Sequence, residues 1–285
     1  MEIRDSSLYI VIPVHNRKEF TRNCLQSLRQ QTVKGCKVVI VDDGSVDGTG
    51  EMLAQEFPEV AVLRGDGNLF WTAATNMGIR YALEHGAERV MTLNNDTIAS
   101  PKFVEAMLHW SEREPLALLG ALNVDFNSQQ PHYGGEILNW PLAASKRLLD
   151  FLPREEWKGI HKVSLYPGRG LLIPREVFEK IGLFDEVKLP HYMADYDFTL
   201  NASNHGFNVF CNYDAWLYIY PEEGGDHKIR RLKSLRGYYQ HLFSIKGGGN
   251  LKNYTKLTLR NCPKKYLLPA LLTGYARRIV GYWIR

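Results

Sequence analysis

Continuous apolar runs alternate with amphipathic segments along the first hundred residues. The runs have the length and composition of buried strands, and they span residues 8–12, 37–41, 60–63 and 90–93. After the first run, Phe20 and Cys24 recur at helical spacing, which predicts a helix that packs on the sheet and that Asn16 can cap. Strands that alternate with helices in this way predict an α/β fold with a mostly parallel sheet, buried on both faces.

The second part of the chain continues less regularly. The pattern predicts a helix over 101–113, a strand over 116–124, and helices over 175–181 and 199–205. Residues 126–160 contain a Gly-Gly pair, three prolines and several aromatic residues, which predicts an irregular insertion between these elements.

Polar side chains follow three of the predicted strands at the point where each strand ends. These segments are residues 13–17, 42–43 and 94–96. Because the carboxyl ends of parallel strands share one edge of a sheet, we expect the three clusters to form one ligand-binding crevice. For 94–96 taken alone, the simpler alternative is a polar loop before the helix that Pro101 opens.

The chemistry of these clusters narrows the ligand. Carboxylate and amide oxygens suit a hard cation such as Mg²⁺ or Mn²⁺, held together with substrate phosphates. No Gly-Lys-Ser/Thr loop is present and no Gly-x-Gly-x-x-Gly follows the first strand, so P-loop enzymes and standard dinucleotide binders are excluded. Asp43 can accept a hydrogen bond from a pyrimidine N–H, and Asp96 can hold a metal on a diphosphate. Together these two residues predict a nucleoside diphosphate site.

Composition places the chain among ordinary globular proteins, with 45% hydrophobic and 23% charged residues. The four cysteines are scattered without a Cys-x-x-Cys pair, which argues against a zinc site or a disulfide framework and favours a reducing compartment. Neither a signal peptide nor an apolar run of about 20 residues is apparent. We therefore expect a cytoplasmic location.

The net charge of +4 conceals a strong asymmetry between the body and the C-terminal segment. Residues 228–285 contain 14 Lys and Arg and no Asp or Glu, which leaves 21 basic against 31 acidic residues in 1–227. The basic segment also has apolar residues at helical spacing, so it predicts amphipathic helices that lie on an anionic membrane surface. The alternative is that these helices pack on the body with solvated basic faces. Nucleic acid is disfavoured as a partner because the basic residues lie apart from the predicted crevice.

Three motifs resemble the family 2 glycosyltransferases with the GT-A fold. They are Ile-Pro-Val-His-Asn-Arg at 12–17, Val-Asp-Asp-Gly-Ser-Val-Asp-Gly-Thr at 41–49 and Leu-Asn-Asn-Asp at 93–96. The resemblance covers about residues 6–230. It implies a Rossmann-like GT-A domain over 1–227, with a nucleotide-sugar half at about 1–98 and an acceptor half at about 99–227. The basic helical tail at 228–285 follows it.

The resemblance also implies roles for residues of the nucleotide-sugar half. Pro13, Asn16, Arg17 and Asp43 would contact the nucleotide, and Asp96 would be the metal-binding end of the Asp-X-Asp motif. The first Asp of that motif is Asn94 here, which leaves Asp96 as the main carboxylate for Mg²⁺ or Mn²⁺. Asn95, between them, and Asn76 complete the predicted donor-binding set. Asn76 lies in a segment similar to rhamnosyltransferase-like members of the family.

In the acceptor half, the resemblance assigns Asp195 as the general base in the segment Met-Ala-Asp-Tyr-Asp-Phe at 193–198. Ala194 replaces the acidic residue that precedes this base in the family. The alternative reading is that Asp195 and Asp197 cap a helix N-terminus. His227 matches a histidine that ligates the metal or the diphosphate, or it is structural. Arg169, between two glycines, meets phosphate or acceptor, or lies in a surface turn.

These features together predict an inverting glycosyltransferase. The predicted donor is a UDP- or dTDP-sugar, with dTDP-rhamnose as one candidate, and the acceptor is a glycan or a lipid-linked glycan at the cytoplasmic face of a membrane. Two alternatives remain from the sequence: a sugar-1-phosphate nucleotidylyltransferase, and a non-catalytic protein that binds nucleotide-sugars or polyanions. The oligomeric state is open.

Overall fold

The structure is a computed structural model that describes residues 7–223 and 233–284. Its centre is a large sheet with the strand order β10-β12-β6-β11-β4-β1-β2-β3, to which β5 and β7 add at β12 and β6. The strands of this sheet are β1 (Leu8–Val14), β2 (Lys37–Asp42), β3 (Ala61–Arg64), β4 (Arg89–Thr92), β5 (Thr97–Ala99), β6 (Leu118–Asp125), β7 (Pro131–Tyr133), β10 (Ile160–Lys162), β11 (Leu171–Pro174) and β12 (Val209–Ile219). The four predicted N-terminal strands are confirmed within one or two residues at each end.

The N-terminal half of the sheet is parallel. β1 pairs in parallel with β2 and β4, and β2 pairs in parallel with β3. β11 is antiparallel to both β4 and β6, and β6 is parallel to β12, so the sheet is mixed but mostly parallel. The carboxyl ends of β1, β2 and β4 therefore meet at one edge, as the sequence predicts.

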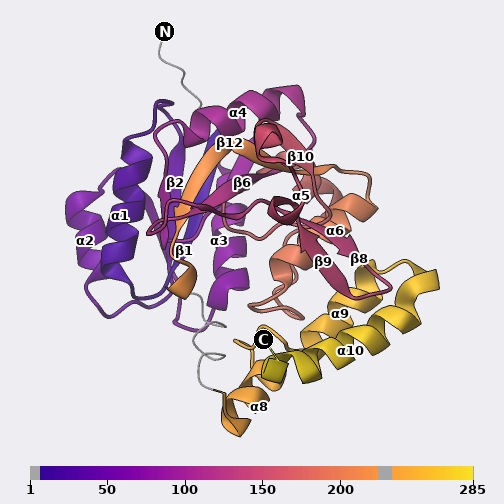
Figure 1. The fold of residues 1–285 in the computed structure, drawn as a ribbon. Helices are drawn as coiled ribbons and strands as arrows, with labels where there is room; N and C mark the ends of the chain where they lie inside the picture. The colour runs from indigo at the N-terminus through magenta and orange to yellow at the C-terminus, as the bar shows by residue number, and fades with distance from the viewer. Residues whose placement is uncertain (1–6, 224–232, 285) are drawn as a thin grey trace.

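Helices cover both faces of the sheet (Figure 1). They are α1 (Lys18–Arg29), α2 (Thr49–Glu56), α3 (Phe70–Glu84), α4 (Phe103–Arg113), α5 (Arg175–Ile181) and α6 (Ala194–Asn204). Two hydrophobic clusters, one on each face, contain nearly every strand residue that is buried. This two-sided burial is the reason that the strands are continuous apolar runs.

Several local predictions need correction. Asn16 does not cap α1, because its side chain accepts from Val46 N–H instead, and Asp47 accepts the Lys18 N–H. Residues 126–160 are more regular than predicted: they include a β-hairpin of β8 (Glu136–Asn139) and β9 (Ala144–Arg147). These errors share one cause, since contacts between distant segments decide them.

In residues 233–284, the described part of the tail, the α-helices are α8 (Leu235–Phe243), α9 (Leu251–Asn261) and α10 (Leu267–Ile284). They lie along one side of the body, next to α6 and the hairpin (Figure 1). α9 packs against α6, and Thr273 of α10 donates to the backbone oxygen of Pro141 in the hairpin turn. The sequence pattern had not indicated α9, which is the helix that attaches the tail.

Candidate active site

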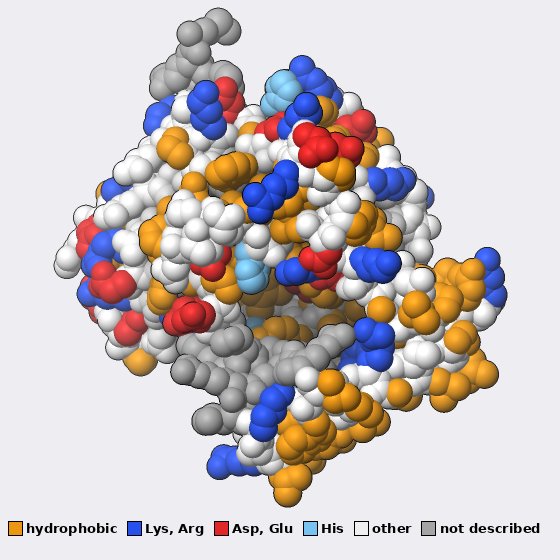
Figure 2. Space-filling model, viewed as in Figure 1, with side chains coloured by type: hydrophobic (Ala, Val, Ile, Leu, Met, Phe, Trp, Pro, Cys, Tyr) orange, Lys and Arg blue, Asp and Glu red, His pale blue; other side chains and the backbone are white. Residues whose placement is uncertain are grey.

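One cavity of about 730 Å³ lies between the C-terminal edge of the parallel strands and the tail. Figure 2 shows the hollow on this face, with charged side chains and histidine near its rim. Seven of the predicted site residues line the cavity, and they are Pro13, Arg17, Asn94, Asn95, Asp96, Arg169 and Asp195. Among the described residues, three of the buried polar atoms without a hydrogen-bond partner belong to its lining: Asp96 Oδ1, His191 Nδ1 and Arg278 Nε. Such atoms are costly unless a ligand satisfies them.

A salt bridge between Arg17 and Asp96 lies where the cavity meets the carboxyl ends of the parallel strands. Arg17 Nη1 donates to Asp96 Oδ2 at 2.7 Å, and Arg17 Nη2 donates to the backbone oxygen of Glu223 at 3.2 Å. Arg17 has φ +69°, a left-handed conformation that is unfavourable for a side chain other than glycine. Such strain is often found at binding sites. The other oxygen, Asp96 Oδ1, is buried and has no hydrogen-bond partner among the described residues.

Asp195 is in the first turn of α6, with its carboxylate at the cavity wall. Its Oδ2 accepts from Gly168 N–H at 3.0 Å, and its Oδ1 accepts from Tyr196 N–H at 2.9 Å. Burial raises the pKa of this carboxyl, although these N–H groups and the nearby Arg169 oppose the increase. Each oxygen retains a lone pair, so the carboxylate can accept a proton from a bound hydroxyl.

The backbone of segment 168–170 packs closely against the indole ring of Trp71 at Gly168. A Cβ on Gly168 would lie 2.3 Å from the ring of Trp71, so no larger residue fits there without movement. Trp71 Nε1 donates to Asn94 Oδ1 at 3.0 Å, which means that this amide oxygen is already engaged. Arg169 Nε donates to Asn123 Oδ1. These contacts hold the wall that supports Asp195.

Asp43 lies behind the cavity wall. Its two carboxylate oxygens accept from Gly67 N–H at 2.8 Å and Leu69 N–H at 3.0 Å, so the side chain organises the loop after β3. Its backbone oxygen contacts His15, which does line the cavity. The contact between Asp43 and a base stays a prediction that requires a hydrogen bond in addition to, or in place of, these two.

Two further predicted residues do not line the cavity. Asn16 bonds to the loop at Val46, as described above. Asn76 is buried in α3, donates to the backbone oxygen of Phe184 and to Glu186, and accepts from Phe184 N–H. It therefore joins α3 to the loop after α5. His227 lies outside the described residues.

Comparisons with known proteins agree with this arrangement. The sequence profile of "Glycosyl transferase family 2" matches residues 9–182, which is more than half of the chain. This chain belongs to glycosyl transferase family 2. It is therefore a glycosyltransferase that uses a nucleotide-sugar as donor, and the nucleotidylyltransferase and non-catalytic alternatives are set aside.

Sequence relatives of this family 2 enzyme support the assignment. It is 27% identical over 208 residues to the dTDP-rhamnosyl transferase RfbF of Shigella flexneri, covering 72% of this chain and 66% of that protein. It is 29% identical over 124 residues to the glycosyltransferase GlyA of Streptococcus pneumoniae, covering 44% of this chain and 16% of GlyA. The match to RfbF thus spans about two thirds of that relative's length.

Solved structures show the same fold. The enzyme superposes on residues 1–349 of S. aureus TarS with a TM-score of 0.60 at 14% identity, covering 97% of this chain and 89% of TarS. A complex of the same TarS segment with UDP gives the same score at 16% identity. The GT-A-like α/β fold predicted from sequence is confirmed.

Enzymes of this family often use a divalent metal ion, so the question is whether residues of this cavity could hold one. Within residues 7–223 and 233–284, no group of three or more His, Cys, Asp or Glu side chains is placed to hold an ion. Asp96 offers one buried carboxylate oxygen without a partner, and Asn94 Oδ1 is engaged by Trp71. A single carboxylate suits a cation that arrives with substrate phosphates, and does not suit a permanently held one.

Sequence reasoning missed the contribution of the tail to this family 2 site. Lys246, Tyr254, Leu257 and Arg278 line the cavity from the tail side, and His191 lines it from the loop before α6. The basic composition of the tail was visible in the sequence, but the position of any one cation was not. The tail thus forms part of the cavity wall.

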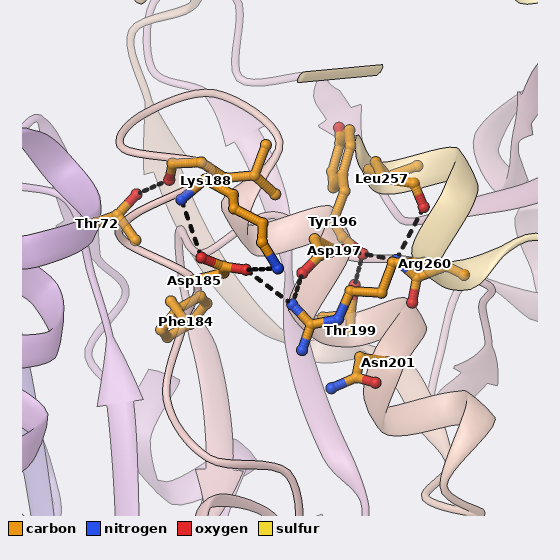
Figure 3. A network of polar contacts seen from close by, with 12 residues as sticks. Thr72, Phe184, Asp185, Lys188, Tyr196, Asp197, Thr199, Asn201, Leu257 and Arg260 are labelled. Atoms are coloured by element: carbon orange, nitrogen blue, oxygen red, sulfur yellow. Dashed lines mark hydrogen bonds and ion pairs between the residues drawn. The ribbon is translucent and has the colours of Figure 1, made fainter. Parts of the chain in front are cut away.

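A buried polar network attaches the tail next to the candidate base (Figure 3). Arg260 Nη1 of α9 donates to Asp197 Oδ2 at 2.8 Å, and Asn261 Nδ2 donates to Asp197 Oδ1 at 2.7 Å. Asp197 is only 2% exposed, and it lies two residues after Asp195. The two aspartates therefore differ in their contacts: Asp197 binds the tail, and Asp195 lines the cavity.

We expect Arg260→Met to lower the free energy of unfolding by about 1–3 kcal/mol at neutral pH, because it leaves the Asp197 carboxylate with less compensation. Burial already raises the pKa of Asp197, against the effect of Arg260. The loss of unfolding free energy should therefore be largest at pH values above the raised pKa of Asp197. It should shrink as the pH falls through that pKa, since protonated Asp197 needs no cation. Urea unfolding at several pH values measures it. Lys252→Met, an exposed change on the same helix, is the control, and equal losses in both variants would contradict the role of this pair.

Proposed function

We propose that the enzyme transfers a sugar with inversion from a UDP- or dTDP-sugar to a hydroxyl of a glycan or lipid-linked glycan. The supporting observation is that Arg17, Asp96 and Asp195 line one cavity, although they come from three separate segments. The nucleotide-sugar half, 1–98, supplies the first two residues. The acceptor half, 99–227, supplies Asp195.

In the proposed reaction, the acceptor oxygen attacks C1 of the sugar on the side opposite the leaving group. The C1–oxygen bond to the diphosphate breaks, and Asp195 takes the proton of the acceptor hydroxyl. Burial raises the pKa of Asp195, which makes it a better proton acceptor than an ordinary aspartate. A single displacement of this kind inverts the configuration at C1. Arg17 stabilises the negative charge that develops on the diphosphate.

Mg²⁺ or Mn²⁺ is the proposed cofactor, and Asp96 would hold it through its free oxygen. When bound, the ion would neutralise charge on the leaving diphosphate. Because Arg17 already contacts the other oxygen of Asp96, the protein itself supplies one cation at this position. His227 stays a proposed second ligand.

The donor is proposed to carry a pyrimidine base, and dTDP-rhamnose is the leading candidate because RfbF of Shigella flexneri is a dTDP-rhamnosyl transferase. A thermal-shift panel of UDP-, dTDP- and GDP-sugars, with and without Mn²⁺, tests this. We expect stabilisation by the pyrimidine nucleotide-sugars, larger with Mn²⁺, because ligands that bind the folded state raise its stability. Stabilisation by GDP-sugars alone would contradict the assignment.

We also propose that the tail contacts an anionic membrane surface. Exposed apolar side chains gather on α8 and α10, including Leu235, Tyr239, Leu268, Leu272 and Trp283. Figure 2 shows many apolar side chains on the surface of the tail helices on this face. The absence of any acidic residue in 228–285 favours anionic lipid, at about 1 kcal/mol per basic residue near the surface. No helix in the described residues has the length and apolar content needed to cross a bilayer.

The double variant Leu268→Asp with Leu272→Asp should reduce binding to vesicles of phosphatidylglycerol and phosphatidylcholine by about tenfold or more, because both side chains would insert into the interface. Vesicle flotation measures the bound fraction. Val46→Asp, at a side chain that is 90% exposed on the body, is the control and should bind as the unmodified protein does. Unchanged binding of the double variant would exclude this surface.

A further inference from the structure

The tail side of the cavity is cationic and contains no carboxylate. Lys246 and Arg278 line it, and neither forms an ion pair with another described residue. The whole segment 228–285 contains no Asp or Glu that could neutralise them. At the opposite end of the cavity, by contrast, the cation Arg17 is paired with Asp96. Three of the lining cations have no ion pair among the described residues: Lys246 and Arg278 on the tail side, and Arg169, which bonds to Asn123. Two of these three uncompensated cations therefore lie on the tail side.

Arg278 is held in a fixed position. Its guanidinium lies over the ring of Tyr254 at 3.5 Å from the centroid, and its Nη1 donates to the backbone oxygen of Gly274. A Cβ on Gly274 would overlap the Tyr254 hydroxyl, so glycine is what allows α9 and α10 to approach here. The stacked, oriented guanidinium is preorganised for a planar or tetrahedral anion.

The same guanidinium is left with unused hydrogen-bonding capacity. Arg278 Nε is buried and has no partner among the described residues. Burial lowers the pKa of Arg278 to about 10, which still leaves it charged at neutral pH. A buried donor that carries a charge and lacks an acceptor is strongly unfavourable unless a ligand supplies one.

His191 adds a second unsatisfied group beside Lys246. Its Nδ1 is buried and without a partner among the described residues, and it lines the same cavity. Burial, with a smaller effect from Lys246, lowers the pKa of His191 to about 4. It is therefore neutral at neutral pH and can donate one hydrogen bond. Asn253 of α9 donates to the backbone oxygen of the next residue, Tyr192, which connects this loop to the tail.

We propose that Arg278, Lys246 and His191 form a subsite for a phosphate or diphosphate group of the acceptor. This inference rests on the proposed function, in which the donor diphosphate occupies the Arg17 side and the acceptor enters from the tail side. The two ends of the cavity then bind two different anions, with Asp195 in the lining they share. The acceptor class is a phosphorylated one, either a lipid diphosphate that carries a glycan or a glycan phosphate.

The test measures binding of inorganic diphosphate by calorimetry to the full chain saturated with UDP, which fills the donor end. Arg278→Met and Lys246→Met should each weaken this binding by about tenfold or more, because each removes a charge-assisted hydrogen bond. Arg277→Met and Lys252→Met remove exposed cations that do not line the cavity, and they should bind as the unmodified protein does. Lys246 is exposed, so its variant is informative even if Arg278→Met fails to fold.

Equal binding in all five proteins would overturn the subsite, while UDP affinity measured in the same samples reports on the proposed function separately. If UDP itself does not bind, the titration without nucleotide still compares the variants, and an absence of any difference again overturns the subsite. Geranyl diphosphate and glucose 1-phosphate then distinguish the two sources. Tighter binding of the first indicates a lipid-linked acceptor, and tighter binding of the second a glycan phosphate.

Discussion

Replacing Asp195 with asparagine is expected to lower kcat by about 10²–10⁴-fold, because the acceptor hydroxyl loses the group that takes its proton. Asparagine keeps the size of the side chain, and its amide oxygen can still accept the Gly168 N–H that positions it. Affinity for the nucleoside diphosphate should therefore change by no more than about twofold. The measurements are single-turnover transfer for the chemical step and calorimetry for the nucleotide.

The pH profile gives an independent test of the same assignment. A base must be deprotonated to act, so activity falls as the pH decreases through its pKa. Burial raises the pKa of Asp195, which moves this acidic limb above the range of an ordinary aspartate. The residual activity of Asp195→Asn should lose that limb.

Glu136→Gln is the matched control for Asp195→Asn. Glu136 also lines the cavity, and burial raises its pKa as well, so it is the strongest competing carboxylate in the described part of the chain. It accepts a hydrogen bond from Ser145 on the other strand of the β8–β9 hairpin. If Glu136→Gln lost more turnover than Asp195→Asn, the base would have to be reassigned.

The sequence predicted the features that depend on local pattern. Apolar runs identify β1, β2, β3 and β4 because strands buried on both faces have no polar alternation. The polar residues that follow β1 and β4 do line one cavity, since parallel strands carry them to the same edge. The motif indicates a helix N-terminus near Asp195, although α6 begins at Ala194, five residues before the helix predicted over 199–205.

Features that depend on distant contacts could not be predicted in this way. Asn76 looks like a ligand residue by its neighbours in sequence, but it bonds to Phe184, which is 108 residues later. Asp43 is occupied by the loop at Gly67 and Leu69, which a strand-end argument does not anticipate. The tail appeared as a separate basic segment, whereas Arg260 compensates a buried aspartate of the body. In each case the partner, and not the residue itself, determines the role.

The second large effect is expected for Arg17→Met, which should weaken UDP binding by about 10- to 100-fold. Methionine is shorter than arginine but is likewise unbranched at Cβ, so the cost of the left-handed backbone at this position is about the same. Removing the guanidinium takes away the cation nearest the proposed diphosphate position. Arg22→Met, on the exposed face of α1 and paired with Glu19 and Glu56, is the control and should bind UDP normally.

The same variant should change Mn²⁺ binding in the opposite direction. Arg17 Nη1 contacts Asp96 Oδ2 at 2.7 Å, so it competes with any cation for that carboxylate. Without it, both oxygens of Asp96 are available and no positive charge repels the ion, and Mn²⁺ affinity in the absence of nucleotide should increase by about tenfold. Electron paramagnetic resonance of free Mn²⁺ measures this directly. Asp96→Asn should abolish this gain in Mn²⁺ affinity, because an amide is a weaker ligand than a carboxylate for a hard cation.

Opposite shifts in the affinities for UDP and Mn²⁺ would mean that arginine and metal neutralise the same diphosphate. Parallel losses would mean that Arg17 acts mainly by holding the site together.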